Sequence, residues 1–320
     1  MLDVFFTVDV EVWCDGWNNL DAEFPNAFQQ YVYGPTAKGN YGLPYQIDVL
    51  NAHGIKGVFF VEPLFATRFG TDPLKEIVGL LRDGEQDVEL HLHTEWVDES
   101  PVPLLIGTQG KRQYMRDFSL AEQTTLIALG AKLLKDAAGG QITAFRAGSF
   151  GLNLDTLRAT GANGIPFSSS YNASMHGLDS GVMPGVAVID TLECDGIHEI
   201  PMTVFSDGTG SLRHAQLTAC SFKEMEGLLW QALEMGRSNF VILSHNFELL
   251  NEAKTRPDDV VVQRFRQLCS FLDRNRDSFR VRGFQGLETK ATVRQPDPLS
   301  SPIWRTGARV LEQVYRRRYR

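Results

Sequence analysis

The chain alternates short β-rich runs with segments of helical periodicity, and this alternation most limits what it can fold into. The strand candidates are residues 2–10, 56–62, 87–93, 142–148, 185–193, 198–205 and 239–245, with 281–287 as a weaker last one. Repeated β-then-α units imply parallel strands joined by right-handed crossovers. Such units build either a barrel or a doubly wound sheet. We favour an α/β barrel.

Helix starts between the strand candidates are well marked. Thr71 precedes a helical pattern with Pro73 near its first turn and Gly84 just past its end. The pairs Ser119 with Glu122 and Ser221 with Glu224 have the S-x-x-E spacing of a capping box. These signals predict helices that begin at about residues 72, 120 and 222.

Composition and charge indicate which binding partners and which cellular compartment to expect. With 320 residues and 43% hydrophobic content, the chain can bury a large core. A formal net charge of −8 argues against nucleic acid or an anionic membrane as a partner for the body of the protein. The four scattered cysteines suggest neither a metal motif nor a disulfide framework. The first residues lack the pattern of a signal peptide, so we expect a soluble cytoplasmic protein.

The sequence changes character after residue 290, so we expect a barrel over residues 1–290 and a Pro-containing linker with an Arg-rich helix over 291–320. Six arginines stand against one glutamate from Arg305 onward. One interpretation is a solvated helix that packs Val310, Leu311 and Val314 on the body while its charges face water. The other is peripheral contact with a membrane surface or a lipid-linked glycan precursor.

Two pairs of polar side chains stand at the ends of predicted strands. Asp9 and Glu11 interrupt an apolar run and share one face because they are two residues apart. His91 and His93 form the same kind of pair in "VELHLHTEW". If their strands are neighbours in a parallel barrel, all four side chains reach the mouth where βα proteins keep active sites. Carboxylates and imidazoles suit zinc or another first-row divalent ion.

Each pair alone also has a structural interpretation. Asp9 and Glu11 could cap helices or pair with arginines, and His91 and His93 could be polar residues stacked at a strand end. Taken together, the two pairs favour a metal site, since a divalent cation stabilises carboxylates that are costly to bury unpaired.

Two later strand candidates end in further charged side chains. Arg146 lies in "TAFRAGSFG", where small residues let the backbone turn sharply, and His245 lies in "FVILSHNFELL". A guanidinium near Asp9 would hold that carboxylate ionised, and an imidazole across the pocket could act as general acid or base. A structural ion pair is an equally simple role for Arg146.

The order of these motifs resembles the polysaccharide deacetylases of the NodB-homology type, carbohydrate esterase family 4. The likeness covers about residues 2–290 and looks closest to the lipopolysaccharide-biosynthesis branch of the WalW kind, with its DVE-type first and HxH-type second motifs. The resemblance implies a distorted (β/α) barrel of about seven parallel strands. It also implies a divalent metal, commonly zinc, and removal of acetyl groups from an N-acetylated glycan or lipid-linked sugar.

The resemblance also assigns roles, with departures at two motifs. Val10 stands where the family has a metal-binding aspartate, so Glu11 is the substitute ligand on the same strand face. The family's second motif has histidines four residues apart, whereas this chain offers His91 and His93 as ligands and Val97 at the family's second position. A metal site of Glu11, His91 and His93 is therefore expected.

The catalytic roles follow the same correspondence. Asp9 matches the general base, Arg146 the arginine that orients it, and His245 the general acid of the last motif.

Three tryptophans near the motifs, Trp13, Trp17 and Trp96, are either platforms for sugar rings or packing residues.

Two other classes of protein remain open at this level. Amidohydrolase or PHP-type barrels also use an HxH pair as metal ligands, although there the pair normally ends the first strand. A catalytically silent glycan-binding barrel is the other alternative, suggested by the valine at position 10.

Overall fold

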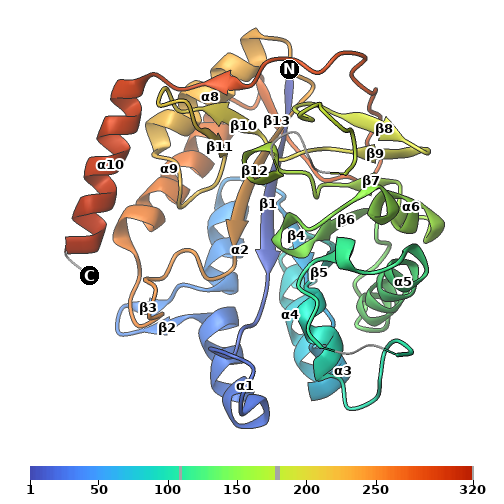
Figure 1. The fold of residues 1–320 in the computed structure, drawn as a ribbon. Helices are drawn as coiled ribbons and strands as arrows, with labels where there is room; N and C mark the ends of the chain where they lie inside the picture. The colour runs from blue at the N-terminus through green and yellow to red at the C-terminus, as the bar shows by residue number, and fades with distance from the viewer. Residues whose placement is uncertain (108–109, 177–180, 319–320) are drawn as a thin grey trace. The chain divides into compact units, whose positions relative to one another are not determined.

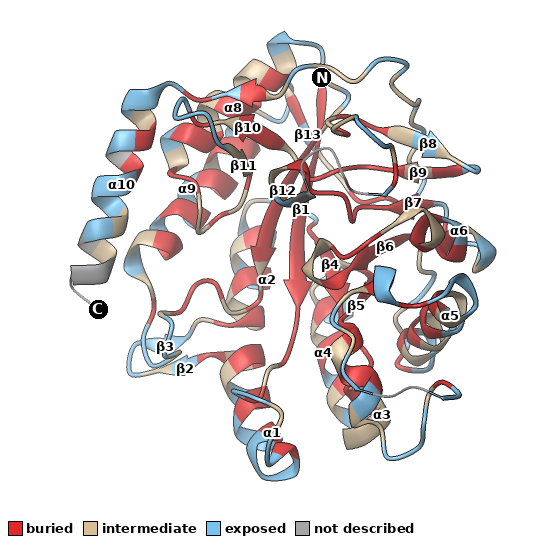
Figure 2. Cartoon of the chain, viewed as in Figure 1, coloured by how far each residue is buried: buried red, intermediate tan, exposed pale blue. Residues whose placement is uncertain are grey.

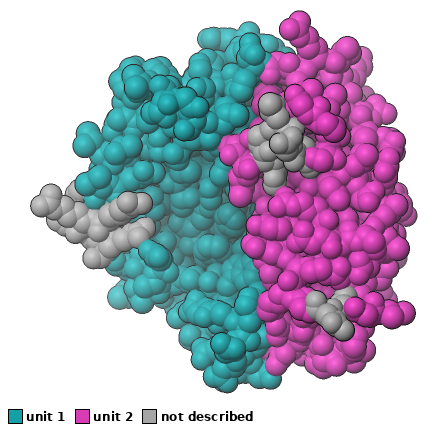
Figure 3. All heavy atoms as spheres, in the orientation of Figure 1, with its two compact units in different colours: residues 1–57, 203–283, 297–320 teal, residues 58–202, 284–296 magenta. Residues whose placement is uncertain are grey.

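The structure is a computed structural model that describes residues 1–107, 110–176 and 181–318. The chain divides into two compact units, coloured separately in Figure 3. Unit 1 comprises residues 1–57, 203–283 and 297–320, and unit 2 comprises residues 58–202 and 284–296. Each unit is assembled from segments that are distant in the sequence.

Three parallel strands form the centre of unit 1 (Figure 1). β1 (Leu2–Val10) pairs with β12 (Asn239–His245) and with β13 (Phe279–Val281). Every residue of β1 is buried, as expected for a parallel strand that is covered on both faces. Helices α2 (Leu43–Ala52), α8 (Phe222–Glu234) and α9 (Asp259–Arg274) belong to the same unit.

The other elements of unit 1 are shorter, apart from its last helix. They are α1 (Leu20–Phe28), the π-helix η1 (Gln29–Tyr33), the hairpin β2 (Pro35–Thr36) and β3 (Gly39–Asn40), the small sheet of β10 (Val204–Ser206), β11 (Leu212–His214) and β14 (Leu299–Ser300), and α10 (Ile303–Arg318).

Unit 2 contains a second run of parallel strands. Its order is β4 (Val58–Val61), β5 (Asp87–Leu92), β6 (Ala144–Ala147), β7 (Phe167–Ser168) and β9 (Ile197–Glu199), with β8 (Leu192–Cys194) antiparallel to β9. Its helices are α3 (Ala66–Phe69), α4 (Asp72–Asp83), η2 (Thr94–Glu99), η3 (Met115–Asp117), α5 (Leu120–Asp136), η4 (Gly148–Phe150), α6 (Leu154–Ala162) and α7 (Ala173–His176).

The helix starts predicted from capping signals are confirmed. Ser119 and Ser221 each accept from the backbone N–H three residues later, and the glutamate there reaches back to the cap. Helix α4 runs from Asp72 to Asp83, between Thr71 and Gly84 as predicted.

The strand predictions fail around residues 185–205. Residues 185–191 form no strand, because the side chain of Gln295 accepts from the N–H groups of Ile189 and Asp190, which a ladder would otherwise use. The run 198–205 is split between β9 and β10, and the short strand β7 was not predicted. The strand predicted at 281–287 lies slightly earlier, as β13 at 279–281.

Of the two interpretations of the C-terminal helix, the one with apolar packing on the body is wrong. Val310, Leu311 and Val314 were expected to pack on the body, but they are 45%, 72% and 52% exposed. Arg309 is buried instead, at 2% exposure, against Glu224 of α8 and Asp207, the residue after β10. The domain boundary near residue 290 stays a prediction. Within the described parts of the chain, no helix combines the length and apolar character that crossing a membrane requires.

Candidate functional site

Two of the predicted residues, Asp9 and His245, lie side by side at the carboxyl ends of paired strands in unit 1. The parallel register of β1 and β12 makes Asp9 and His245 direct partners. Glu11 follows one residue beyond β1 on the same face as Asp9, and both acids are almost fully buried, at 3% and 5% exposure. The apolar strand therefore carries its two carboxylates to one end, where His245 also arrives.

The Glu11 carboxylate has a fixed orientation. Its backbone N–H donates to Asn246 Oδ1 at 3.0 Å, and Asn246 Nδ2 donates to the Glu11 carbonyl at 3.1 Å, which extends the ladder beyond the strand. Trp13 Nε1 donates to Glu11 Oε2 at 2.7 Å. The other carboxylate oxygen, Oε1, lies 3.9 Å from His245 Nε2. Glu11 thus turns one oxygen to an indole and the other toward the imidazole.

His245 is held by a second carboxylate that the sequence reasoning missed. Its Nδ1 lies 2.7 Å from Glu248 Oε1, and the side chain of Gln216 donates to the same oxygen. Gln46 Nε2 donates to the His245 carbonyl at 3.1 Å. Because the acceptor of Nδ1 is a carboxylate, the ring carries its proton on Nδ1 when neutral and presents Nε2 toward Glu11.

The surroundings of His245 favour its charged form. Burial by itself lowers its pKa, but the hydrogen bond to Glu248 and the negative charges of Glu11, Glu248 and Asp9 raise the pKa to about 9. The imidazolium is therefore the main form at neutral pH, which suits a group that gives up a proton.

The same three residues of unit 1 offer a set of metal-ligating atoms. One ligand atom each from Asp9, Glu11 and His245 lies within 4.8 Å of the others. Two carboxylates and an imidazole are a donor set that first-row divalent cations accept. This set shares only Glu11 with the predicted ligands Glu11, His91 and His93, and His245 could join it only as the neutral imidazole.

His91 and His93 end β5 in unit 2. Both are buried, and their ring centroids are 4.8 Å apart at an interplanar angle of 85°. His91 Nδ1 lies 2.9 Å from the carbonyl of Arg146, and His93 Nδ1 lies 3.3 Å from a carboxylate oxygen of Glu95. Both partners only accept, so Nδ1 carries the proton and Nε2 carries the lone pair of each neutral ring. Metal-binding histidines are commonly oriented in this way.

The turn after β6 explains the small residues of "FRAGSFG". A Cβ built on Gly148 would lie 2.8 Å from the His93 ring, so a side chain there would displace the imidazole. Ser149 and Phe150 follow with φ values of 50° and 54°, a region that costs energy for residues other than glycine. The sharp turn predicted from sequence is confirmed. It places Gly148, which has no side chain, against the His93 ring.

Arg146 is fully buried and fixed within unit 2. Its Nε donates to the Ser169 carbonyl at 2.9 Å and its Nη2 to Ser169 Oγ at 3.1 Å, while the guanidinium lies 4.1 Å over the Phe60 ring. Glu199 lies nearby: burial raises its pKa, and the charge of Arg146 partly opposes that rise. The segment "FSSSYN" (167–172), which begins with β7, was the available signal for these contacts.

The three tryptophans have different surroundings. Trp13 and Trp17 are partly exposed and form an edge-to-face pair with centroids 5.8 Å apart, beside Glu11. Trp96 is 1% exposed and packs against Phe65 and Phe69, so it is a core residue and not a sugar platform. The first two remain candidates for contact with a sugar ring.

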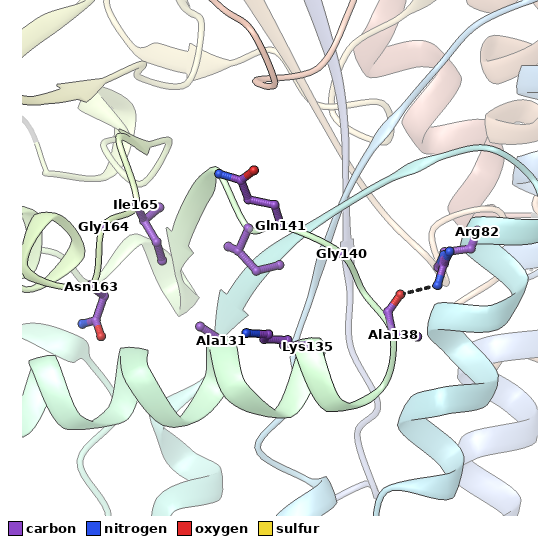
Figure 4. A pocket seen from close by; sticks show the side chains of 10 residues that line it. Arg82, Ala131, Lys135, Ala138, Gly140, Gln141, Asn163, Gly164 and Ile165 are labelled. Atoms are coloured by element: carbon purple, nitrogen blue, oxygen red, sulfur yellow. Dashed lines mark hydrogen bonds between the residues drawn. The ribbon is translucent and has the colours of Figure 1, made fainter.

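A hollow in unit 2 has a different lining (Figure 4). It has a volume of about 620 Å³ and is lined by residues that precede β6 and β7 together with the end of α5. Arg82 Nη1 donates to the Ala138 carbonyl across one side at 2.7 Å. None of the residues predicted to be functional lines it.

Comparison with known proteins finds similarity in structure but not in sequence. No protein-family model matches the chain, and no curated protein matches its sequence. Its structure is similar to that of a Mycobacterium smegmatis protein described as a "putative polysaccharide deacetylase", with a TM-score of 0.55 and 18% identity. The match covers 92% of this chain and 94% of that one.

That likeness confirms the predicted fold class, an α/β fold of the distorted-barrel type found in polysaccharide deacetylases. Weaker matches are a family 4 carbohydrate esterase from Streptomyces lividans and a family 4 pseudoenzyme from Bacillus anthracis, each at 12% identity. The first has a TM-score of 0.43 and covers 91% of this chain and 96% of that one. The second has a TM-score of 0.38, with coverage of 82% and 60%.

Proposed function

We propose that this protein is a metal-dependent hydrolase that removes N-acetyl groups from a carbohydrate. The observation that carries the proposal is the gathering of Asp9, Glu11 and His245 at the carboxyl ends of β1 and β12. Carboxyl strand ends are where βα folds place their chemistry. A base, a candidate ligand and an acid thereby meet in unit 1.

We further propose that Glu11, His91 and His93 hold the metal. The support is local: Glu11 is oriented by Trp13, and each histidine is oriented through Nδ1 so that Nε2 is its ligand atom. A divalent metal, proposed to be zinc, would lower the pKa of a water molecule and polarise the acetyl carbonyl.

The chain's own residues then complete the hydrolysis. Asp9 takes a proton as water attacks the acetyl carbon, and Arg146 is proposed as the residue that orients Asp9. The C–N bond breaks, acetate leaves, and His245 gives its proton to the departing amine. Glu248 holds the imidazole in place throughout this step.

The proposed substrate is more specific than the fold alone indicates. The deacetylase described for the similar Mycobacterium smegmatis structure and the motif order together favour an N-acetylated glycan. Within that class we propose a lipid-linked or lipopolysaccharide precursor, handled on the cytoplasmic side by a member of the WalW-like branch. Trp13 and Trp17 would offer ring faces to the sugar.

The experiment combines metal content with product formation. Purified protein is analysed for divalent metals by mass spectrometry, and acetate release is measured with a panel of N-acetylated oligosaccharides. We expect about one metal ion per chain and acetate from at least one substrate. Absence of both would refute the proposal, while bound metal without acetate would favour a silent glycan-binding protein.

A matched pair of variants tests the ligands. His91→Ala should lower the metal content, whereas His53→Ala should leave it unchanged, because His53 pairs with Asp273 at 3.2 Å in a structural contact. Unchanged metal content in His91→Ala would mean that the pair of His91 and His93 is structural.

A further inference from the structure

Helix α10 packs on unit 1 through its polar side. Thr306 Oγ1 donates to the Asp207 carbonyl at 2.8 Å, and Arg309 Nε lies 3.3 Å from the Glu224 carboxylate. Arg316 Nε donates to Asp258 at 2.8 Å. These residues recur along one side of the helix, so charge and hydrogen bonding, rather than apolar packing, fix which side faces the body.

The partners of this polar side are buried acids. Glu224 is fully buried and also closes the capping box of α8, and Asp207 is 5% exposed. Buried carboxylates of this kind are tolerated when a cation pairs with them, and Arg309 supplies it. Another arginine of α10, Arg305, lies against Gly227 of α8, where a Cβ would be 1.7 Å from its Nη1.

The opposite side of α10 is an exposed apolar face. Its members are large hydrophobic side chains that are 45% to 72% exposed, namely Ile303, Trp304, Val310, Leu311 and Val314. Figure 2 shows most of the α10 ribbon in the colours of exposed and intermediate residues, while β1 and β12 are red. A continuous face of this kind on a surface helix marks an interaction site.

The charges around this face favour one kind of binding partner. Beyond Arg316, which pairs with Asp258, the sequence places Arg317, Arg318 and Arg320 at one end, and the first turn of α10 contains no acidic residue. A second copy packed antiparallel would bring these arginines over a turn without an acid, and a parallel copy would bring them together. An anionic lipid surface accepts both the apolar side chains and the arginines, and tryptophan favours the membrane interface.

We propose that α10 lies in the interface of an anionic membrane, with its apolar face among the lipid headgroups and acyl chains and with unit 1 on its polar side. The net charge of −8 on the whole chain opposes this attraction at long range, so binding is expected to be weak and to fall with salt. The inference does not depend on the proposed enzymatic activity.

The test uses the full-length protein and vesicles of defined composition. Sedimentation with vesicles of 70% phosphatidylcholine and 30% phosphatidylserine should exceed that with pure phosphatidylcholine by about tenfold or more. Raising the salt to about 0.5 M should remove most of the difference. No sedimentation with the anionic vesicles would overturn the proposal.

Paired variants separate the apolar face from general stickiness. Trp304→Ser with Leu311→Ser should lower binding to the anionic vesicles by about tenfold or more. The control is Val102→Ser with Ile106→Ser, which removes two exposed apolar side chains from a loop of unit 2 and should leave binding unchanged. Both positions on α10 are exposed, so the melting temperature should not change, and it is measured to verify folding.

Light scattering of the same proteins in solution tests the alternative occupant. We expect one oligomeric state for the parent protein and for both double variants. A dimer that is lost only in Trp304→Ser with Leu311→Ser would show that a second copy covers the face, and would overturn the membrane assignment.

Discussion

Unit 1 buries acids in two different ways. Under α10, Glu224 and Asp207 face Arg309, a permanent cation that is itself 2% exposed. At the ends of β1 and β12, Glu11 and Glu248 both lie close to one imidazole, that of His245. The first arrangement has a fixed charge balance, and the second changes its charge when a single group titrates.

This difference separates a structural cluster from a chemical one. Arginine stays protonated at any pH in which proteins fold, so the pairs under α10 can only hold the helix in place. Histidine can release and take up a proton near neutral pH, so the cluster at the strand ends can also transfer one. Both clusters contain buried carboxylates, so burial does not distinguish them. They differ in the residue that supplies the positive charge, which is arginine in one and histidine in the other.

The largest effect is expected from Arg309→Met. The change keeps the volume but leaves Glu224 and Asp207 without this cation, which should cost about 3–5 kcal/mol in the free energy of unfolding. Urea unfolding measures it. The exposed pair of Arg276 with Asp273 supplies the control, since Arg276→Met should cost less than about 1 kcal/mol. Equal costs for the two variants would contradict a holding role for Arg309.

Asp9→Asn should act on the reaction and not on the fold. Removal of the general base should lower the rate of acetate release by at least ~100-fold. The melting temperature should change little, since asparagine has the same shape as aspartate. A variant with the parent rate would exclude Asp9 as the base, and a variant that fails to fold would place Asp9 with the structural acids.

Glu89 in unit 2 is a third kind of buried acid, held only by hydrogen bonds. The N–H groups of Thr143 and Ala144 each donate to it at 2.7 Å, yet burial raises its pKa to about 7. The folded state therefore keeps the proton between about pH 4.5 and 7, where the unfolded chain has lost it. Stability from this group is present below pH 4.5 and is lost as the pH rises through 7.

Glu89→Gln should remove that pH dependence, because the amide does not titrate. As the pH rises from 4.5 to 8, the unfolding free energy of the parent should fall, and that of the variant should not change through this position. The difference between variant and parent should therefore shift by about 1–3 kcal/mol in favour of the variant. Urea unfolding at the two pH values measures the change. The same difference between parent and variant at both pH values would mean that burial does not raise the pKa of Glu89.

The smallest effect is expected from Glu248→Gln. Loss of the carboxylate should lower the pKa of His245 from about 9, so the alkaline limb of the pH–rate profile should move to lower pH. At pH 8 the rate should fall by roughly tenfold, with a smaller loss at pH 6. A uniform loss at every pH would indicate that Glu248 only positions the ring.

Much of the fold and several site residues followed from local patterns. Asp9, His91, Arg146 and His245 were found because each stands at or near the end of a mostly apolar run that forms a buried parallel strand. Capping boxes gave the helix starts, since both partners lie within one turn. Glu248 was missed although it lies three residues after His245, because a single acid in a loop carries no periodic signal.

The sequence by itself determined the alternation of strands and helices, the positions of the strand-end side chains, and the amphipathic character of the C-terminal helix. The tertiary structure decided which side of that helix faces the body. Helical periodicity separates a polar side from an apolar side, but it does not say which one is buried. That choice depended on Asp207 and Glu224, two acids about 80 to 100 residues earlier in the chain, whose burial requires the arginine that α10 brings to them.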